Sequence, residues 1–125
     1  MSRFEIHAAI VLWLFAWAIV SLAGAVLGQF RQRCEWRAGF WFMTGLWGVI
    51  NAGIAWVSHL TGPPALDTLA TILLVNCFLD VLYLVVGAYL ATRGAALLRG
   101  FGWAVLVQGA FLLAFDVYFY TRCLR

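Results

Sequence analysis

The chain has 125 residues, of which 66% are hydrophobic and 10% are charged, and its mean hydropathy is +0.97. An average soluble domain carries about 25% charged residues, so this composition excludes a soluble globular protein. The formal net charge of +3 does not indicate nucleic-acid binding, because every basic side chain is an arginine outside the apolar stretches. That placement is typical of membrane proteins, whose arginines set orientation and contact lipid headgroups.

Four apolar stretches are long enough to cross a bilayer, whose hydrocarbon core of about 30 Å requires about 20 helical residues. They cover approximately residues 6–28, 38–60, 69–91 and 101–120. The connections are too short to fold alone, so we expect residues 1–125 to form a single integral membrane domain. Because short connections join antiparallel neighbours, the predicted fold is all-α, with four transmembrane helices in an antiparallel up-down-up-down bundle.

Local patterns indicate where the first three stretches begin and end. Ala23-Gly24-Ala25 could be the cleavage site of a secretory signal, but the apolar run continues to Leu27 and is long enough to span, so we expect a retained helix. Thr61-Gly62-Pro63-Pro64 cannot continue the second helix. Asp67 or Thr68 is the expected N-cap of the third helix.

The distribution of arginines predicts the orientation in the membrane. The first and third connections carry five of them: Arg31, Arg33, Arg37, Arg93 and Arg99. The opposite side carries three: Arg3, Arg122 and Arg125. The positive-inside rule therefore places these two connections in the cytoplasm and both termini outside it.

The cysteines and histidines form no recognisable metal or redox motif. All three cysteines are expected to be unpaired, because no CxxC spacing occurs; they are Cys34, Cys77 and Cys123. His7 and His59 lie at predicted helix ends on the outer side, where Glu5 and Asp116 could complete a ligand set for zinc. No local spacing such as HxxxH enforces that arrangement, so no metal site is predicted and the two histidines are only alternative candidates.

Small residues four positions apart recur in the first three stretches. The pairs are Gly24/Gly28, Gly48/Ala52 and Gly87/Ala91. Small residues let helix backbones approach closely in lipid. The pairs therefore predict packing within the bundle, which we favour, or a homodimer interface.

Three tryptophans lie deep in the predicted spans, at Trp13, Trp17 and Trp47. They could line a flat cofactor slot, but aromatic residues at such depths more often fill the core or face lipid. We favour this second interpretation, and the sequence identifies no cofactor.

Polar residues near the middle of the spans are the candidate functional site. An Asp at mid-helix in lipid costs about 2.5–3.5 kcal/mol, so Asp80 requires a partner or a function. Asn76 precedes it by four residues and shares its helix face, which Tyr83 continues. In the predicted topology Asn51 lies at a similar depth, and Gln108 comes from the fourth span. The predicted polar site comprises Asp80, Asn76, Asn51, Gln108 and Tyr83, with Asp116 as an outer second carboxylate.

Two interpretations of Asp80 compete. In the structural one, amide side chains hold a protonated carboxyl, because hydrogen bonds within a membrane protein contribute only about 0.6 kcal/mol each on average. In the functional one, Asp80 lies in a hydrated cavity and exchanges a proton or binds a cation. No Lys or Arg lies within a span, so no fixed ion pair is available. Asp80 is therefore either neutral or hydrated.

Three regions resemble a small bacterial family of four-span membrane proteins with no assigned function. They are NCFLDVLY (76–83) with Gly87, GFGW (100–103) with QGAF (108–111) and FD (115–116), and FM (42–43) with WGVIN (47–51). The resemblance covers the last three spans. It implies no activity, but it implies that the polar residues selected above belong to the motifs of the family.

The expected function is that of a small multi-pass protein of a bacterial inner membrane with a protonatable polar site. It would act as a proton- or cation-coupled carrier or bind a small ligand, and a bundle of this size would need to form an oligomer to enclose a transport path. The alternative is a non-catalytic accessory subunit of a larger membrane complex. No catalytic constellation occurs, so no enzyme is expected. The expected partners are lipid and a second copy or another membrane protein, with no nucleic acid.

Overall fold

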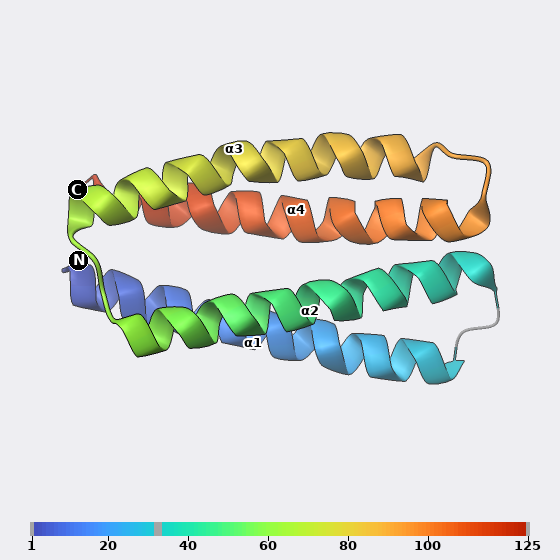
Figure 1. The fold of residues 1–125 in the computed structure, drawn as a ribbon, viewed down its shortest axis with the longest axis horizontal. Coiled ribbons are helices and arrows are strands. Elements are labelled where there is room, and N and C mark those ends of the chain that lie inside the picture. Colours follow the sequence, from blue (N-terminus) through green and yellow to red (C-terminus); the bar gives the residue numbers. More distant parts are fainter. Residues whose placement is uncertain (1, 32–33, 125) are drawn as a thin grey trace.

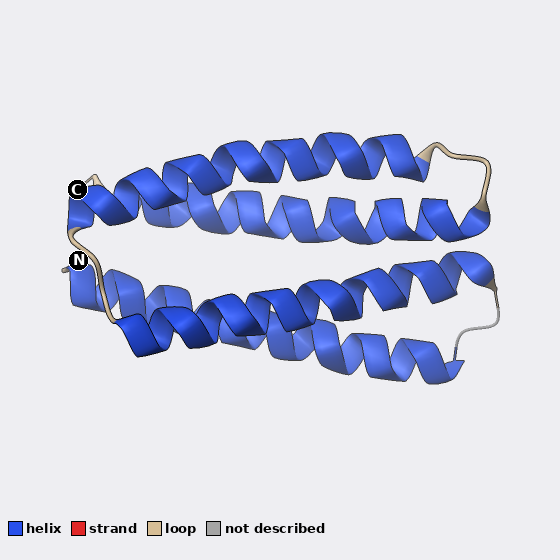
Figure 2. Ribbon diagram, in the orientation of Figure 1, coloured by secondary structure: helices blue, strands red, loops and turns tan. Residues whose placement is uncertain are grey.

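The computed structural model describes residues 2–31 and 34–124, which form four long helices joined by short connections (Figure 1). The helices are α1 (Arg3–Arg31), α2 (Glu35–Thr61), α3 (Leu66–Ala91) and α4 (Ala96–Cys123). The described residues contain no strand (Figure 2). Successive helices run in opposite directions, and the N and C ends lie at the same end of the molecule (Figure 1). The predicted all-α fold with four helices is confirmed.

Each of the four helices is long and apolar enough to cross a membrane. Each also extends a few residues beyond the apolar stretch from which it was predicted. This difference arises because a helix can continue into polar surroundings, where its side chains contact headgroups and water. The orientation argument also used Arg33 and Arg125, which lie outside the described residues.

The start of α3 differs from the prediction. Ala65 is the N-cap, with φ −60° and ψ 152°, and the helix begins at Leu66, so Asp67 and Thr68 lie in its first turn. The Oδ1 atom of Asp67 accepts a hydrogen bond from the backbone N–H of Thr68 at 2.9 Å. An acidic side chain stabilises the positive end of the helix dipole from within the first turn, so a capping side chain at position 65 is not required.

α4 is the central helix of the molecule. It packs closely along α3 and α2 and also contacts α1. The residues that it buries are Gly100, Gly102, Ala104, Val105, Gln108, Gly109, Leu112, Asp116 and Phe119. The two hairpins, α1–α2 and α3–α4, are close antiparallel pairs as expected. The consecutive helices α2 and α3, however, make hardly any close contact, because α2 packs against α4, which runs in the same direction.

Glycines permit the close approach of α4 to its neighbours. Gly100 of α4 lies against the backbone oxygen of Trp36 in α2, and Gly87 of α3 lies against the backbone oxygen of Gly102 in α4. An added Cβ at either position would meet backbone atoms, which cannot move aside as the end of a flexible side chain can. The parallel contact between α2 and α4 therefore depends on a glycine that no periodic pattern singled out.

The small residues noted in the sequence pack inside the molecule. Gly24 and Gly28 of α1 lie against the indole ring of Trp41 in α2, and Gly48 of α2 lies against Leu22 in α1. These glycines hold the α1–α2 hairpin together. The favoured interpretation, packing within the bundle, is confirmed for them.

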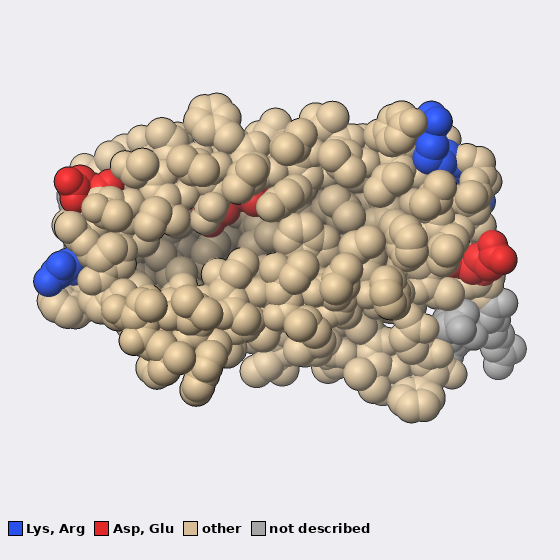
Figure 3. Space-filling view, in the orientation of Figure 1, with Lys and Arg blue, Asp and Glu red and all other residues tan. Residues whose placement is uncertain are grey.

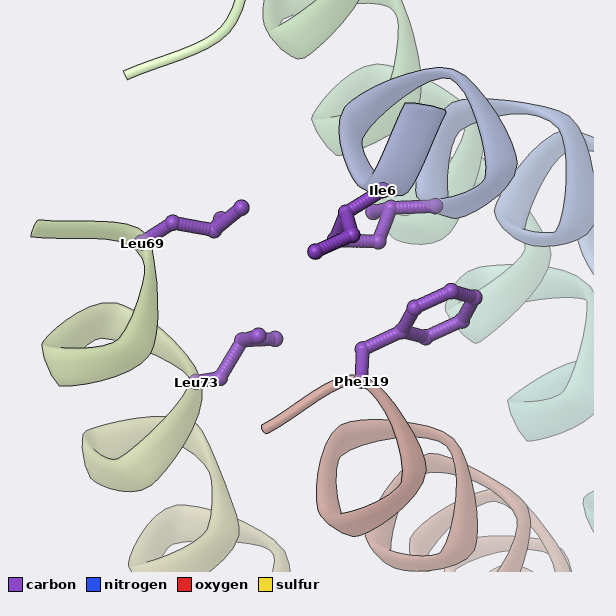
Figure 4. Packing of buried hydrophobic residues seen from close by; sticks show 5 residues of the cluster. Ile6, Leu69, Leu73 and Phe119 are labelled. Carbon is purple, nitrogen blue, oxygen red and sulfur yellow. The ribbon is translucent and has the colours of Figure 1, made fainter. Parts of the chain in front are cut away.

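A hydrophobic cluster joins α1, α3 and α4 at the end that holds the termini. In Figure 4 the side chains of Leu69 and Leu73 on α3 point toward Ile6 of α1 and Phe119 of α4. All four are nearly inaccessible to solvent. Among the described residues, α2 contributes no residue to this cluster. Side chains of α1 and α4 line the space between α2 and α3.

Candidate functional site

A cavity of about 470 Å³ lies where α2 and α3 do not pack together. It extends from the Gly62–Pro64 connection toward the middle of the molecule, and side chains from all four helices line it. Figure 3 shows a hollow on the face formed by α2 and α3, with acidic atoms visible inside it. Most of the lining residues are apolar, so the acidic atoms are conspicuous.

Two carboxyl groups form the acidic part of this cavity. Asp80 of α3 and Asp116 of α4 both line it, although their side chains are only 3% and 5% exposed. The two carboxyl groups lie within hydrogen-bonding reach of each other. The close antiparallel packing of α3 and α4 brings them together from positions 36 residues apart in the sequence.

The pair has an incomplete set of hydrogen-bond partners. Within residues 2–31 and 34–124, the Oδ2 atom of Asp80 is the buried side-chain oxygen or nitrogen that lacks a partner. The described lining contains no arginine, and the chain has no lysine. Ionised carboxylates only accept hydrogen bonds, so two adjacent ones attract each other only when a proton lies between them. A carboxyl pair of this kind is stabilised when its two members share one proton.

A separate polar network surrounds Gln108. Its Oε1 atom accepts hydrogen bonds from Trp17 Nε1 at 2.7 Å and from Asn51 Nδ2 at 3.3 Å, and its Nε2 atom donates to Ser21 Oγ at 3.1 Å. The Trp17 ring also stacks on Phe111 at a centroid distance of 3.9 Å. These bonds connect α1, α2 and α4 and satisfy both ends of the Gln108 amide. The network therefore holds three helices in register.

The structure thus distributes the polar residues predicted as one site between two environments. Asp80, Asn76, Asn51 and Tyr83 line the cavity, whereas Gln108 lies behind Asn51 and does not. No hydrogen bond in the described part of the chain joins Asp80 to any of the three amide side chains. Its neighbour is Asp116, which the sequence had placed nearer the outer surface as a second carboxylate.

Sequence reasoning missed two members of the Gln108 network. Ser21 is 4% exposed and Trp17 is partly buried, and both are on α1. The only signal was their spacing of four residues, which puts them on one helix face. That spacing alone does not distinguish a polar contact from ordinary packing.

An aromatic pair closes the inner end of the cavity. The rings of Trp47 on α2 and Tyr83 on α3 meet edge to face, with a centroid distance of 5.0 Å and an interplanar angle of 65°. Trp17 is engaged with Gln108, and Trp13 is 58% exposed. The three deep tryptophans therefore have three different surroundings and do not face one shared slot.

At the end that holds the termini, the described residues bring together no group of three His, Cys, Asp or Glu side chains that could hold a metal ion. His7 Nε2 lies 2.9 Å from the backbone oxygen of Ser58, and His59 lies beside the ring of Trp56. The described residues do not bring the alternative zinc set together, and Asp116 instead lines the cavity with Asp80. The three cysteines are free, as expected.

The comparisons with known proteins identify a family. The sequence model of DUF6992, a family of unknown function, matches residues 13–117. The chain belongs to DUF6992. The match includes most of α1, so it extends beyond the last three spans in which the resemblance was found. The search of curated proteins and the search of solved structures give no match. Membership in DUF6992 supplies no activity, and both carboxyl residues of the cavity lie within the matched segment.

Proposed function

We propose that this DUF6992 protein is an integral membrane protein that binds a small, mainly apolar ligand between α2 and α3. Binding is linked to the proton shared by Asp80 and Asp116. The observation that carries the proposal is a pair of buried carboxyl groups at the base of a cavity whose described lining contains no arginine or lysine. A pair serving only to hold α3 against α4 would not require a cavity beside it.

The chemistry of the pair supports a link between ligand and proton. Two carboxylates in contact cannot both ionise readily, because burial removes the water that would stabilise each charge. The proton that they share leaves one oxygen, Asp80 Oδ2, without a hydrogen-bond partner. A ligand that changes the charge or hydration beside these oxygens changes the free energy of holding the proton, and by linkage the proton changes the affinity for the ligand.

The size and lining of the cavity support a small-molecule site. Its volume of about 470 Å³ lies within the usual range of roughly 300–1,000 Å³, and such sites combine apolar walls with a few polar groups. The cavity reaches the connection at Gly62–Pro64 and lies between α2 and α3. A ligand can therefore enter from the outer end or from the lipid. An accessory subunit would need an outer binding face, not an internal cavity, so the cavity favours the binder.

The membrane setting proposed here is the cytoplasmic membrane of a bacterium. Four helices of sufficient length and apolarity support the membrane location, and the arginine distribution supports termini outside the cytoplasm. Carriage of the ligand across the bilayer would require a homo-oligomer, because a single bundle of four helices is too small to enclose a path for a solute.

Infrared spectroscopy of the protein in lipid nanodiscs tests the shared proton. At neutral pH we expect the carbonyl stretch of a protonated carboxylic acid, which the Asp80→Asn/Asp116→Asn double variant removes. Asp67→Asn is the matched control, because Asp67 is an exposed carboxylate in the first turn of α3, and it should leave the band unchanged. Absence of the band from the unaltered protein would contradict the proposal.

Photolabelling tests the ligand site. The probe trifluoromethyl-phenyldiazirine, a small apolar aromatic molecule, should label residues of the cavity such as Asn51 and Asn76 with a saturable dose dependence, measured by mass spectrometry. Lipid-facing Phe78 and Val85, which are 71% and 61% exposed, should be labelled in proportion to dose. Proportional labelling at all four positions would show that the cavity is only a lipid-filled space.

A further inference from the structure

We infer that the ligand class of this cavity is a lipophilic organic cation, such as an aryl quaternary ammonium ion, which displaces the proton shared by Asp80 and Asp116. The inference rests on the proposed function and names the substrate class of the same site. It follows from three properties of the cavity: its charge, its aromatic residues and its lack of a metal-ligand set.

The charge of the cavity favours a positive ligand. Asp80 and Asp116 line it, and no arginine is among its described lining residues. The nearby titratable groups are His7 on α1 and Cys77 and Tyr83 on α3. α2 contributes only non-titrating polar groups to the lining, such as an amide and a hydroxyl.

His7 is the one basic side chain in the described lining, and its Nε2 atom lies 2.9 Å from the backbone oxygen of Ser58. A cation beside the pair therefore replaces the proton as the charge that lets both carboxyl groups ionise. An anion would meet two acidic groups and no fixed positive charge. The described lining thus selects against anionic ligands.

The aromatic residues favour an organic cation. Trp47 and Tyr83 meet edge to face at the inner end, and Phe115 lines the wall formed by α4. Ring faces attract cations, most strongly where water is excluded, and aromatic cages are a known way to hold quaternary ammonium groups. The apolar side chains of the cavity, including Leu14 and Leu112, match the hydrocarbon part of such a ligand.

The ligand set argues against an inorganic ion. Among the described residues no group of three His, Cys, Asp or Glu side chains occurs that could hold a metal ion, and two carboxyl groups alone fill only part of the coordination sphere of such an ion. Hard divalent cations take six or more oxygen ligands. An organic cation needs no such shell, because its own alkyl and aryl groups already surround its charge.

A matched pair of probes tests the class. Benzyltrimethylammonium and its neutral carbon isostere, neopentylbenzene, have nearly the same shape and differ in charge. Each is used to suppress photolabelling of Asn51 and Asn76 by the diazirine in nanodiscs of zwitterionic lipid. The concentration of each probe is expressed as its amount within the membrane. On that scale we expect the cation to suppress labelling at a concentration lower than that of the neutral probe by about tenfold or more. Calorimetry in buffers of different ionisation enthalpy should show release of about one proton per bound cation.

Variants identify the groups responsible. The preference for the cation should disappear in the Asp80→Asn/Asp116→Asn double variant and persist in Asp67→Asn. Asp80→Glu keeps the carboxyl group and should retain the preference, which guards against a folding defect in the double variant. Equal potency of the two probes, or a preference that survives in a folded double variant, would overturn the inference.

The outcomes separate the inference from the proposed function. Saturable photolabelling together with the carboxylic acid band, but no preference for the cation, would refute the ligand class and leave the proton-linked binding site. Labelling that rises in proportion to dose at every position would refute both.

Discussion

At the scale of single residues, Asp80 could be selected from the sequence because hydrocarbon does not solvate a carboxylate. The sequence did not identify Asp116 as the residue that it contacts. Asn76 was expected beside it because a spacing of four residues fixes two side chains on one helix face. The contact with Asp116 instead crosses between α3 and α4, and such a contact depends on the rotation and axial offset of two separate helices.

Gln108 shows the same limit and supports a stability prediction. Gln108→Leu removes three hydrogen bonds and leaves polar atoms of Trp17, Asn51 and Ser21 without this partner. We expect a loss of about 1–3 kcal/mol in the free energy of unfolding, measured by titration with SDS in mixed micelles. The control is Gln29→Leu, since Gln29 is exposed and makes one long bond of 3.3 Å to Ala38. A control loss as large as that of Gln108→Leu would contradict the role of the network.

At the scale of elements, length and apolarity predicted the four helices, and glycines determine how these pack. Gly100→Ala should destabilise the protein by about 1–3 kcal/mol, because the new Cβ would meet the backbone oxygen of Trp36 in α2. Gly53→Ala is the matched control. Among the described residues, no atom beyond its chain neighbours and the backbone of its own helical turn lies within 4 Å of a Cβ at that position, and alanine is the better helix former by about 1 kcal/mol.

The same SDS titration measures both glycine variants. A neutral Gly100→Ala would show that α2 and α4 are not held in the close parallel contact described here. The separation of α2 from α3 would then also lose its explanation, because the cavity exists where α2 turns away from its consecutive neighbour toward α4.

At the scale of the whole molecule, the orientation in the membrane remains a prediction, and single cysteines test it. Cys34 is exposed at the start of α2, and it becomes the sole cysteine when Cys77 and Cys123 are replaced by serine. A membrane-impermeant maleimide applied to intact spheroplasts should label Ser2→Cys in a cysteine-free background. It should reach Cys34 only after permeabilisation. The opposite pattern would reverse the orientation expected from the arginines.

The sequence by itself determined that the chain has four long apolar helices and one mid-span carboxylate that needs an explanation. Both conclusions follow from local properties, namely the length and hydropathy of each stretch and the cost of Asp80 in hydrocarbon. Only the tertiary structure decided that α2 packs on α4, that a cavity remains between α2 and α3, and that Asp116 faces Asp80 within it. These features depend on how separate helices rotate and slide against one another. That arrangement is set by backbone contacts at glycines such as Gly100, which hydropathy does not register.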